Sequence, residues 1–316
     1  MLAIPTKGVG RSVNAHNVRL DVLCDWIAST VLYEQTELSI TDVVDTLIEE
    51  EKYTTEDFAY EMLGNVWMEF RRRQHCIGGE FYPLEIRSRW IRPQCTWRQS
   101  PAYAFCLLLS IAPYYDWWTS EIGGDYNEQG ELFELLTKES LEAQYQEWRF
   151  LHTGWARSNT AGLERIVNEI AEHLGESQGR LALWNEPNVK ELGLDLLFYR
   201  SYPDGRVGIP VYLMQCASGG NWHSKRNTPD LNIWGDVVQF TTMPKRAFAV
   251  PFALEDKEFT QSCVIVDGLL VDRCRLLAAS RYQDPWVSES LEERIIIWVE
   301  PRIRKLLQHS FDYYPG

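Results

Sequence analysis

The sequence predicts an α/β protein in which a mainly α-helical N-terminal region, residues 1–128, precedes an α/β domain, residues 129–316, with a central mixed sheet flanked by helices. Apolar residues recur at helical spacing near the N-terminus. From residue 190 onward, runs rich in β-branched and aromatic residues alternate with turn sequences and helical segments. That alternation is typical of a sheet covered by helices. With 45% apolar and 24% charged residues, the chain has the composition of a folded globular protein.

The N-terminal region is expected to be mainly helical. Apolar residues at helical spacing between positions 20 and 31 predict a first helix. Capping signals at Ser39–Asp42 and Thr54–Asp57 predict the starts of two more. The segment 76–97 is rich in Gly, Pro and aromatic residues, which predicts loops and short strands, and the apolar run 103–111 predicts a buried helix. We expect this region to have a regulatory role or to contact a partner or DNA.

The second region begins after the polar, turn-forming segment 121–130. Helices are predicted from Glu131 to about residue 148 and from about residue 160 to Gly175, whose glycine suits a left-handed helix end. Further strands are expected at 247–252 and 264–279, the second with a possible turn at Asp267-Gly268. Together these elements form the predicted sheet and its flanking helices.

A β-hairpin is the most informative local prediction. Two β-rich runs flank Pro203-Asp204-Gly205, a turn in which Pro fixes φ and Gly accepts a left-handed conformation. Asp195 and Gln215 are equally distant from Gly205 along the chain, so regular pairing about the turn would place them opposite each other. Both side chains are then expected within reach of one ligand.

The residues around this hairpin suit phosphodiester hydrolysis. That reaction needs a divalent cation held by oxygen ligands and, usually, a positively charged group near the scissile phosphate. The hairpin supplies an acid, Asp195, inside an otherwise apolar strand, where an unpartnered carboxylate would be costly. Lys225 follows shortly afterwards and could supply the positive charge, although a solvated basic pair with Arg226 is the simpler interpretation.

The order E-L-G-L-D, hairpin, Q-C-A and then Lys225 resembles the PD-(D/E)xK nuclease superfamily, most closely its Mrr-type restriction endonuclease branch. The resemblance implies a restriction-endonuclease-like core. It also implies that Asp195 binds metal, that Glu191 is the acid before the glycine, and that Gln215 is the glutamine of Q-x-K. Ala217 stands where that motif has its lysine, and Lys225 is the candidate replacement.

The resemblance also implies an acid on the preceding helix, for which the sequence offers two candidates. Glu134 and Glu164 each lie beside apolar residues on a predicted helix, and Glu164 has the more typical distance from the hairpin. The implied cofactor is Mg²⁺ or Mn²⁺, and both acids stay open as ligands. Glu191, beside Lys190, could equally be a solvated turn residue.

These residues favour a metal-dependent endonuclease that hydrolyses DNA, with RNA as a substrate not excluded. The string from Gln215 to Lys225 also resembles uncharacterised bacterial proteins of antiphage defence loci, which implies a defence effector with a protein partner or regulator. The main alternative is a catalytically inactive nuclease-like subunit that binds DNA or assembles a complex. A transcriptional regulator with a helix-turn-helix in residues 1–128 is a further hypothesis.

Charge constrains how nucleic acid could bind. The net charge is −14, and nucleic-acid binding by general phosphate neutralisation normally needs a basic face. Binding would therefore depend on a local patch, a metal ion, or a partner subunit such as a second copy of the chain. The dense basic run Arg71-Arg72-Arg73 is interpreted as a solvated helix end that complements the helix dipole.

Localisation is expected to be cytoplasmic, without membrane contact. The N-terminal residues lack a continuous apolar stretch, and the longest apolar runs are too short to span a bilayer. The seven cysteines form no C-x-x-C pair, which argues against a structural zinc site or a disulfide framework.

Overall fold

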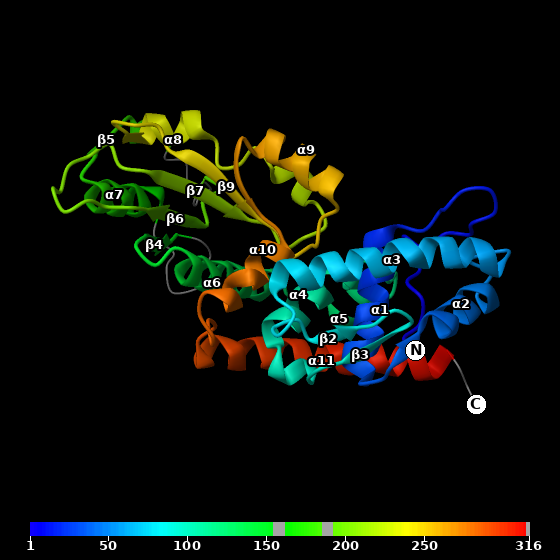
Figure 1. Ribbon diagram of the computed structural model, residues 1–316. Helices are drawn as coiled ribbons and strands as arrows, with labels where there is room; N and C mark the ends of the chain where they lie inside the picture. Colours follow the sequence, from blue (N-terminus) through cyan, green and yellow to red (C-terminus); the bar gives the residue numbers. More distant parts are fainter. Residues whose placement is uncertain (154–161, 185–191, 314–316) are drawn as a thin grey trace. The chain divides into compact units, whose positions relative to one another are not determined.

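The computed structural model describes residues 1–153, 162–184 and 192–313 (Figure 1). The chain divides into two compact units. Unit 1 consists of Met1–Gly124, Pro251–Leu254 and Arg273–Gly316, and unit 2 of Asp125–Val250 and Glu255–Asp272. The predicted border between residues 128 and 129 lies close to the observed one. Residues 251–254 and 273–316, which the prediction placed in the second of two contiguous domains, belong to unit 1 in this division.

Unit 1 is mainly helical, with a small antiparallel sheet in the order β1-β3-β2. Its strands are β1 (Leu38–Ser39), β2 (Leu84–Ile86) and β3 (Trp90–Pro93). Its helices are α1 (Leu20–Glu34), α2 (Ile40–Glu49), α3 (Glu56–Ile77), α4 (Pro101–Ile111), α5 (Trp118–Ile122), α10 (Arg273–Leu277) and α11 (Glu289–Tyr313). The predicted first helix and the buried apolar helix are confirmed as α1 and α4.

Helix starts in unit 1 follow their sequence signals to different degrees. The predicted capping box is present at α2, where the Ser39 hydroxyl accepts from the Asp42 N–H and the Asp42 carboxylate accepts from the Ser39 N–H. At α3 the helix begins close to the predicted start, but its N-cap is Thr55 and makes no side-chain capping bond.

The interpretation of Arg71–Arg73 as a solvated helix end is wrong. Arg73 is 2% exposed and its Nη1 lies 2.6 Å from Asp25 Oδ1, while its Nε lies 2.7 Å from Glu69 Oε1. Arg72 also pairs with Glu69. Two of the three arginines therefore belong to an internal ion-pair cluster, which makes them unsuitable as a phosphate-contacting surface.

Unit 2 is built on a five-stranded mixed sheet in the order β10-β9-β7-β6-β4. β4, β6 and β7 pair antiparallel, whereas β7, β9 and β10 pair parallel. Its strands are β4 (Arg149–His152), β5 (Ser177–Gln178), β6 (Leu196–Tyr199), β7 (Val211–Cys216), β8 (Val238–Gln239), β9 (Lys245–Ala249) and β10 (Gly268–Val271). Its helices are α6 (Tyr126–Gln144), α7 (Leu163–Leu174), α8 (Leu231–Val237) and α9 (Asp256–Val266). The predicted α/β class and the sheet flanked by helices are confirmed.

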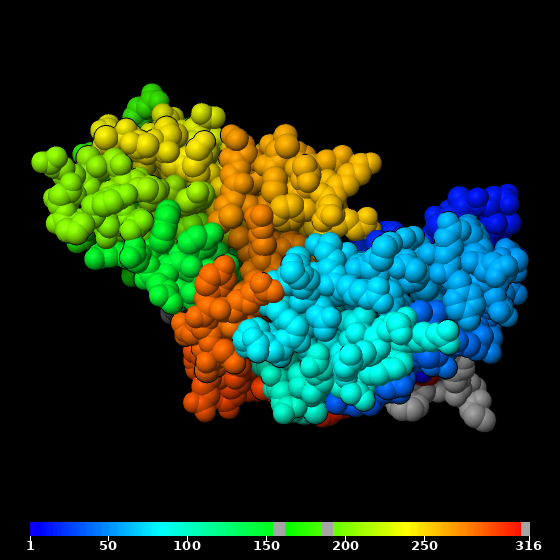
Figure 2. All heavy atoms as spheres, in the orientation of Figure 1, coloured from blue at the N-terminus to red at the C-terminus, as the bar shows by residue number. Residues whose placement is uncertain are grey.

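Helices cover the sheet of unit 2 through its apolar side chains. One core joins α7 and α8 to β6 and β7, with Leu197, Leu213 and Trp234 fully buried. On the other face of the β6–β7 pair, the rings of Phe198 and Tyr212 stack with centroids 4.9 Å apart. α6 contacts β4 and β7. Side chains fill the spaces between the ribbons within each unit, as the space-filling view shows (Figure 2).

The prediction of strand structure over 264–279 is wrong for most of that stretch. Residues up to Val266 belong to α9, and only Gly268–Val271 forms a strand before α10 begins. The predicted turn at Asp267-Gly268 exists, with Asp267 at φ 50°, but it joins a helix to a strand. The reason is topological, because β9 and β10 are parallel and parallel neighbours need a crossover that a tight turn cannot provide.

Within the described ranges, no helix is both long enough and apolar enough to cross a membrane.

Candidate active site

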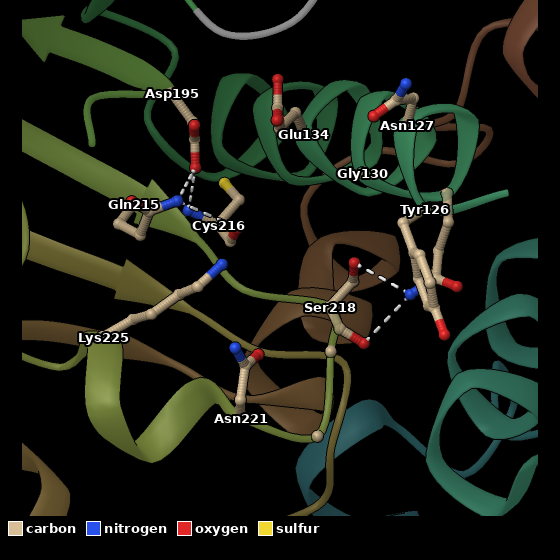
Figure 3. A pocket seen from close by; sticks show the side chains of 13 residues that line it. Tyr126, Asn127, Gly130, Glu134, Asp195, Gln215, Cys216, Ser218, Asn221 and Lys225 are labelled. Carbon is tan, nitrogen blue, oxygen red and sulfur yellow. Dashed lines mark hydrogen bonds between the residues drawn. The ribbon is translucent and has the colours of Figure 1, made fainter. Parts of the chain in front are cut away.

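Unit 2 contains a cavity of about 590 Å³ at the end of the β6–β7 hairpin (Figure 3). Three segments form its walls: the first half of α6, the adjoining ends of β6 and β7, and the loop 218–221 with the following 3-10 turn η4 (Trp222–Lys225). The lining side chains are mostly polar: Tyr126, Asn127, Gln129, Glu134, Asp195, Gln215, Cys216, Ser218, Asn221 and Lys225. Gly130, Gly219 and Gly220 contribute backbone.

Asp195 and Gln215 meet as the hairpin predicts. β6 and β7 pair with Leu196 opposite Met214, so the residues just before β6 and near the end of β7 are neighbours. The Gln215 Nε2 donates to Asp195 Oδ2, and the Cys216 N–H donates to the same oxygen at 2.6 Å. Asp195 is 3% exposed. The predicted cross-strand proximity of these two side chains is therefore confirmed.

The turn before Asp195 explains why a glycine stands there. Leu192 and Gly193 both have positive φ, 48° and 69°, a conformation that favours glycine. A Cβ at Gly193 would also lie 3.1 Å from Gln215 Oε1. The backbone beyond the turn is fixed by Thr153, whose N–H donates to Asp195 O at 2.9 Å and whose hydroxyl donates to Leu194 O at 2.8 Å. Asp195 is thus held by its backbone as well as its side chain.

Glu134 is the helical acid that lies in the cavity. It sits on α6, is 4% exposed, and its Oε2 lies 2.7 Å from His152 Nε2. Burial lowers the pKa of His152, although the charges of Asp195 and Glu131 act in the opposite direction. A neutral imidazole that donates its Nε2–H to Glu134 satisfies both groups. His152 therefore fixes the orientation of the Glu134 carboxyl group.

Glu164, the other candidate on a helix, lies elsewhere. It is exposed in the first turn of α7 and does not line the cavity. The apolar face of α7 packs on the sheet, so its polar face, with Glu164, is turned to solvent. Glu191, predicted as the acid before the glycine, lies outside the described residues.

Lys225 lines the same cavity as Asp195, Gln215 and Glu134. Its stem is exposed on η4, and Figure 3 shows its ammonium group directed into the cavity towards the Asp195–Gln215 pair. Among the described side chains, no carboxylate lies within ion-pairing distance of the Lys225 ammonium. Ala217, in the place of the motif lysine, is buried and its N–H donates to Ala249 O at 2.9 Å. The available ammonium therefore comes from η4 and not from the strand.

The sequence analysis missed His152, which lies behind Glu134, and two residues that line the cavity, Cys216 and Gln129. His152 stands opposite Leu196 in the β4–β6 pair, but β4 is too short for its alternation to show in sequence. Cys216 lines the cavity as a thiol, because burial, together with the charges of Asp195 and Glu134, raises its pKa well above its ordinary value. Gln129 donates to the Ser218 hydroxyl at 3.1 Å and so connects α6 to the loop.

Two donors in the cavity are of the kind that a hard divalent cation takes. The buried carboxylates of Asp195 and Glu134 are oxygen ligands such as Mg²⁺ and Mn²⁺ prefer, whereas the Gln215 amide presents its Nε2 to Asp195. In the part of the chain that the structure describes, no group of three or more His, Cys, Asp or Glu side chains could hold a metal ion.

No protein-family model, curated protein or solved structure matches this chain.

Proposed function

We propose that the cavity is the active site of a metal-dependent nuclease that hydrolyses phosphodiester bonds of DNA. One observation carries the proposal: two buried carboxylates, an amide and an ammonium group line a single cavity, contributed by Glu134, Asp195, Gln215 and Lys225. These groups come from three separate elements, α6, the hairpin and η4. Their convergence is what phosphodiester hydrolysis with a divalent ion needs.

The order of elements in unit 2 supports a restriction-endonuclease-like core. A helix bearing an acid, Glu134, precedes an antiparallel hairpin with Asp195 and Gln215 at its end, within a mixed sheet. This is the arrangement that the sequence resemblance implies, with Glu134 as the helical acid in place of Glu164.

Asp195 and Glu134 would hold Mg²⁺ or Mn²⁺, with Gln215 as a neutral ligand. Bound there, the ion would supply positive charge to the phosphate and lower the pKa of a bound water. Thr153 and His152 keep the Asp195 backbone and the Glu134 carboxyl group in place. An amide in place of a third carboxylate lowers the negative charge of the site, so we expect weak metal affinity.

Lys225 would act on the substrate and not on the metal. Its ammonium group is directed into the cavity from an exposed turn, where it can meet a phosphate without first breaking an ion pair (Figure 3). An ammonium group placed there stabilises the negative charge that develops on the phosphate oxygens during attack by water.

The biological setting remains the one that the sequence suggests. The resemblance of the string Gln215–Lys225 to proteins of antiphage defence loci supports a defence effector in the cytoplasm. A nuclease in its own host needs restraint, so a protein partner, a regulator or a homo-oligomeric state is part of the proposal.

A second candidate is a nuclease-like subunit that binds DNA without cleaving it. Asp195 Oδ2 already accepts from two donors, and the lysine of the strand is replaced by the buried Ala217. In that case Gln215 would stabilise Asp195 where the active enzyme needs a ligand. Binding that is independent of metal, together with no cleavage, distinguishes this candidate.

The test is cleavage of plasmid DNA, with RNA in parallel, by the purified chain in Mg²⁺, Mn²⁺ or EDTA. We expect metal-dependent cleavage that falls at least about 100-fold in Asp195→Asn and Lys225→Ala. Lys257→Ala, which removes an exposed lysine from α9, is the matched control and should retain full activity. Cleavage that is equal in all three variants would exclude the proposed site.

A further inference from the structure

The cavity has two chemically different ends. Figure 3 shows Asp195, Gln215 and Lys225 on one side and Tyr126 on the other, with Ser218 and Asn221 along the loop. Charge is gathered at the first end and at Glu134 between the two. The second end offers an aromatic ring, a hydroxyl and an amide without formal charge. A phosphate group could bind at the charged end, but it has no apolar surface that would contact the ring of Tyr126 at the uncharged end.

The size of the cavity also exceeds what a phosphodiester group requires. Its volume of about 590 Å³ lies within the range of roughly 300–1,000 Å³ that is usual for sites enclosing a small organic molecule. A backbone phosphate with its metal ion could be reached on an open surface. The additional space must therefore be explained by another part of the substrate.

Tyr126 offers a stacking platform at the uncharged end. It is the first residue of α6 and is 64% exposed, although it lines the cavity. An exposed aromatic ring beside hydrogen-bonding side chains is the usual means of holding an unpaired base, whose face stacks and whose edge hydrogen-bonds. Ser218 and Asn221 can both donate and accept, and Gln129 holds Ser218 in place.

The negative net charge of the chain also favours recognition of an unpaired base. A chain with a net charge of −14 gains little from general phosphate neutralisation, on which duplex binding largely depends. Stacking and hydrogen bonding to one base do not need a basic surface. The face of a base is available for stacking on a side chain only where the base is unpaired, since paired bases are stacked on one another inside the duplex.

From these observations we infer that the cavity encloses one whole nucleotide, with its phosphate at Asp195 and Lys225 and its unpaired base on Tyr126. The substrate class is therefore single-stranded nucleic acid, or an unpaired nucleotide within a duplex. Tyr126 is the specificity-determining residue, and the inference rests on the proposed function. It goes beyond that function by naming the state of the strand that the site accepts.

Binding without cleavage tests the inference. Fluorescence anisotropy in Mg²⁺ would compare a labelled single-stranded 20-mer with the same 20-mer as a duplex, using full-length Asp195→Asn protein so that the strand stays intact. We expect the single strand to bind at least about tenfold more tightly than the duplex. Adding Tyr126→Ala should weaken single-strand binding by about 5- to 150-fold, and Tyr126→Phe should largely restore it.

Tyr202→Ala, which removes another exposed tyrosine of unit 2, is the matched control and should leave binding unchanged. Because Tyr126 is largely exposed, its substitution should not unfold the protein, and circular dichroism would verify this. Equal affinity for duplex and single strand, or no effect of Tyr126→Ala, would overturn the inference.

The possible outcomes distinguish a failure of this inference from a failure of the proposed nuclease activity. Metal-dependent cleavage of duplex and single strand at equal rates would exclude the nucleotide site and leave the nuclease intact. Selective binding of the single strand through Tyr126, without cleavage in any metal by the unsubstituted protein, would exclude the nuclease and leave the nucleotide site.

Discussion

Both units bury carboxylates, but the carboxylates of Asp25 in unit 1 and Asp195 in unit 2 have different hydrogen-bond and charge partners. In unit 1, Asp25 Oδ1 lies 2.6 Å from both Arg73 Nη1 and Arg273 Nη2, and its Oδ2 accepts from the Ser110 hydroxyl. In unit 2, Asp195 Oδ2 accepts from neutral donors, an amide and a backbone N–H, beside a cavity. The Asp25 carboxylate is met by guanidinium groups from two other helices, whereas Asp195 accepts hydrogen bonds from residues of its own hairpin beside the cavity.

The pKa of Asp25 shows how complete the neutralisation in unit 1 is. Burial alone raises the pKa of this carboxyl, but the positive charges of Arg273 and Arg73 outweigh it and hold the pKa below its ordinary value. Glu69 behaves in the same way beside Arg72 and Arg73. The cluster joins α1, α3, α4 and α10, and through Arg273 it fixes the chain where it returns to unit 1.

The largest expected effect is a difference in stability between two Asp→Asn variants, one in each unit. Asp25→Asn leaves two buried guanidinium groups without their carboxylate, so the free energy of unfolding should fall by about 3–5 kcal/mol. Asp195→Asn removes a buried charge whose oxygen accepts from neutral donors, and should change stability by no more than about 1 kcal/mol. Urea denaturation of both variants measures the difference. Similar losses in the two variants would show that the comparison between the units is wrong.

The next effect concerns His152, which orients Glu134. His152→Ala should weaken the affinity for Mg²⁺ or Mn²⁺ by about 10- to 100-fold, because a ligand that has lost its orienting partner binds metal less well. Titration of cleavage against metal concentration, with calorimetry of Mn²⁺ binding, measures this. His173→Ala is the matched control, since His173 contacts the Tyr199 hydroxyl of unit 2 at 3.1 Å, outside the cavity. Metal affinity that falls equally in both variants would contradict the role of His152.

The smallest expected effect is that of adding a methyl group at Gly193, which lies behind Gln215. Gly193 and Gly205 have nearly the same positive φ, 69° and 65°. A Cβ at Gly193 would lie 3.1 Å from Gln215 Oε1 and 3.2 Å from Thr228 Cγ2, whereas a Cβ at Gly205 would have no atom within 4 Å. Gly205→Ala should therefore cost about 1 kcal/mol through backbone strain alone. Gly193→Ala should cost about 1–2 kcal/mol and also reduce cleavage by displacing Gln215. Cleavage that is unaffected by Gly193→Ala would mean that Gln215 has no part in the site.

The hairpin could be predicted from local sequence because Pro203 and Gly205 favour a reversal of the chain between two β-rich runs. The Gly205 N–H donates to Tyr202 O in a turn within the longer connection between β6 and β7, and the pairing of the two strands brings Asp195 and Gln215 together. The strand prediction for the residues before Asp267 was wrong because Val264 and Ile265 are β-branched but lie exposed on α9. Topology outweighed their preference for strands, since parallel strands require a crossover.

By itself, the sequence determined the α/β class, the hairpin with its register, and the pairing of an acid with an amide at its end. Only the tertiary structure decided between Glu134 and Glu164, added His152, and brought Lys225 to the cavity. The physical reason is the range of the interactions. Turn and strand preferences act between residues close in sequence, whereas which helix faces the hairpin depends on how the apolar faces of α6 and α7 are buried against the sheet.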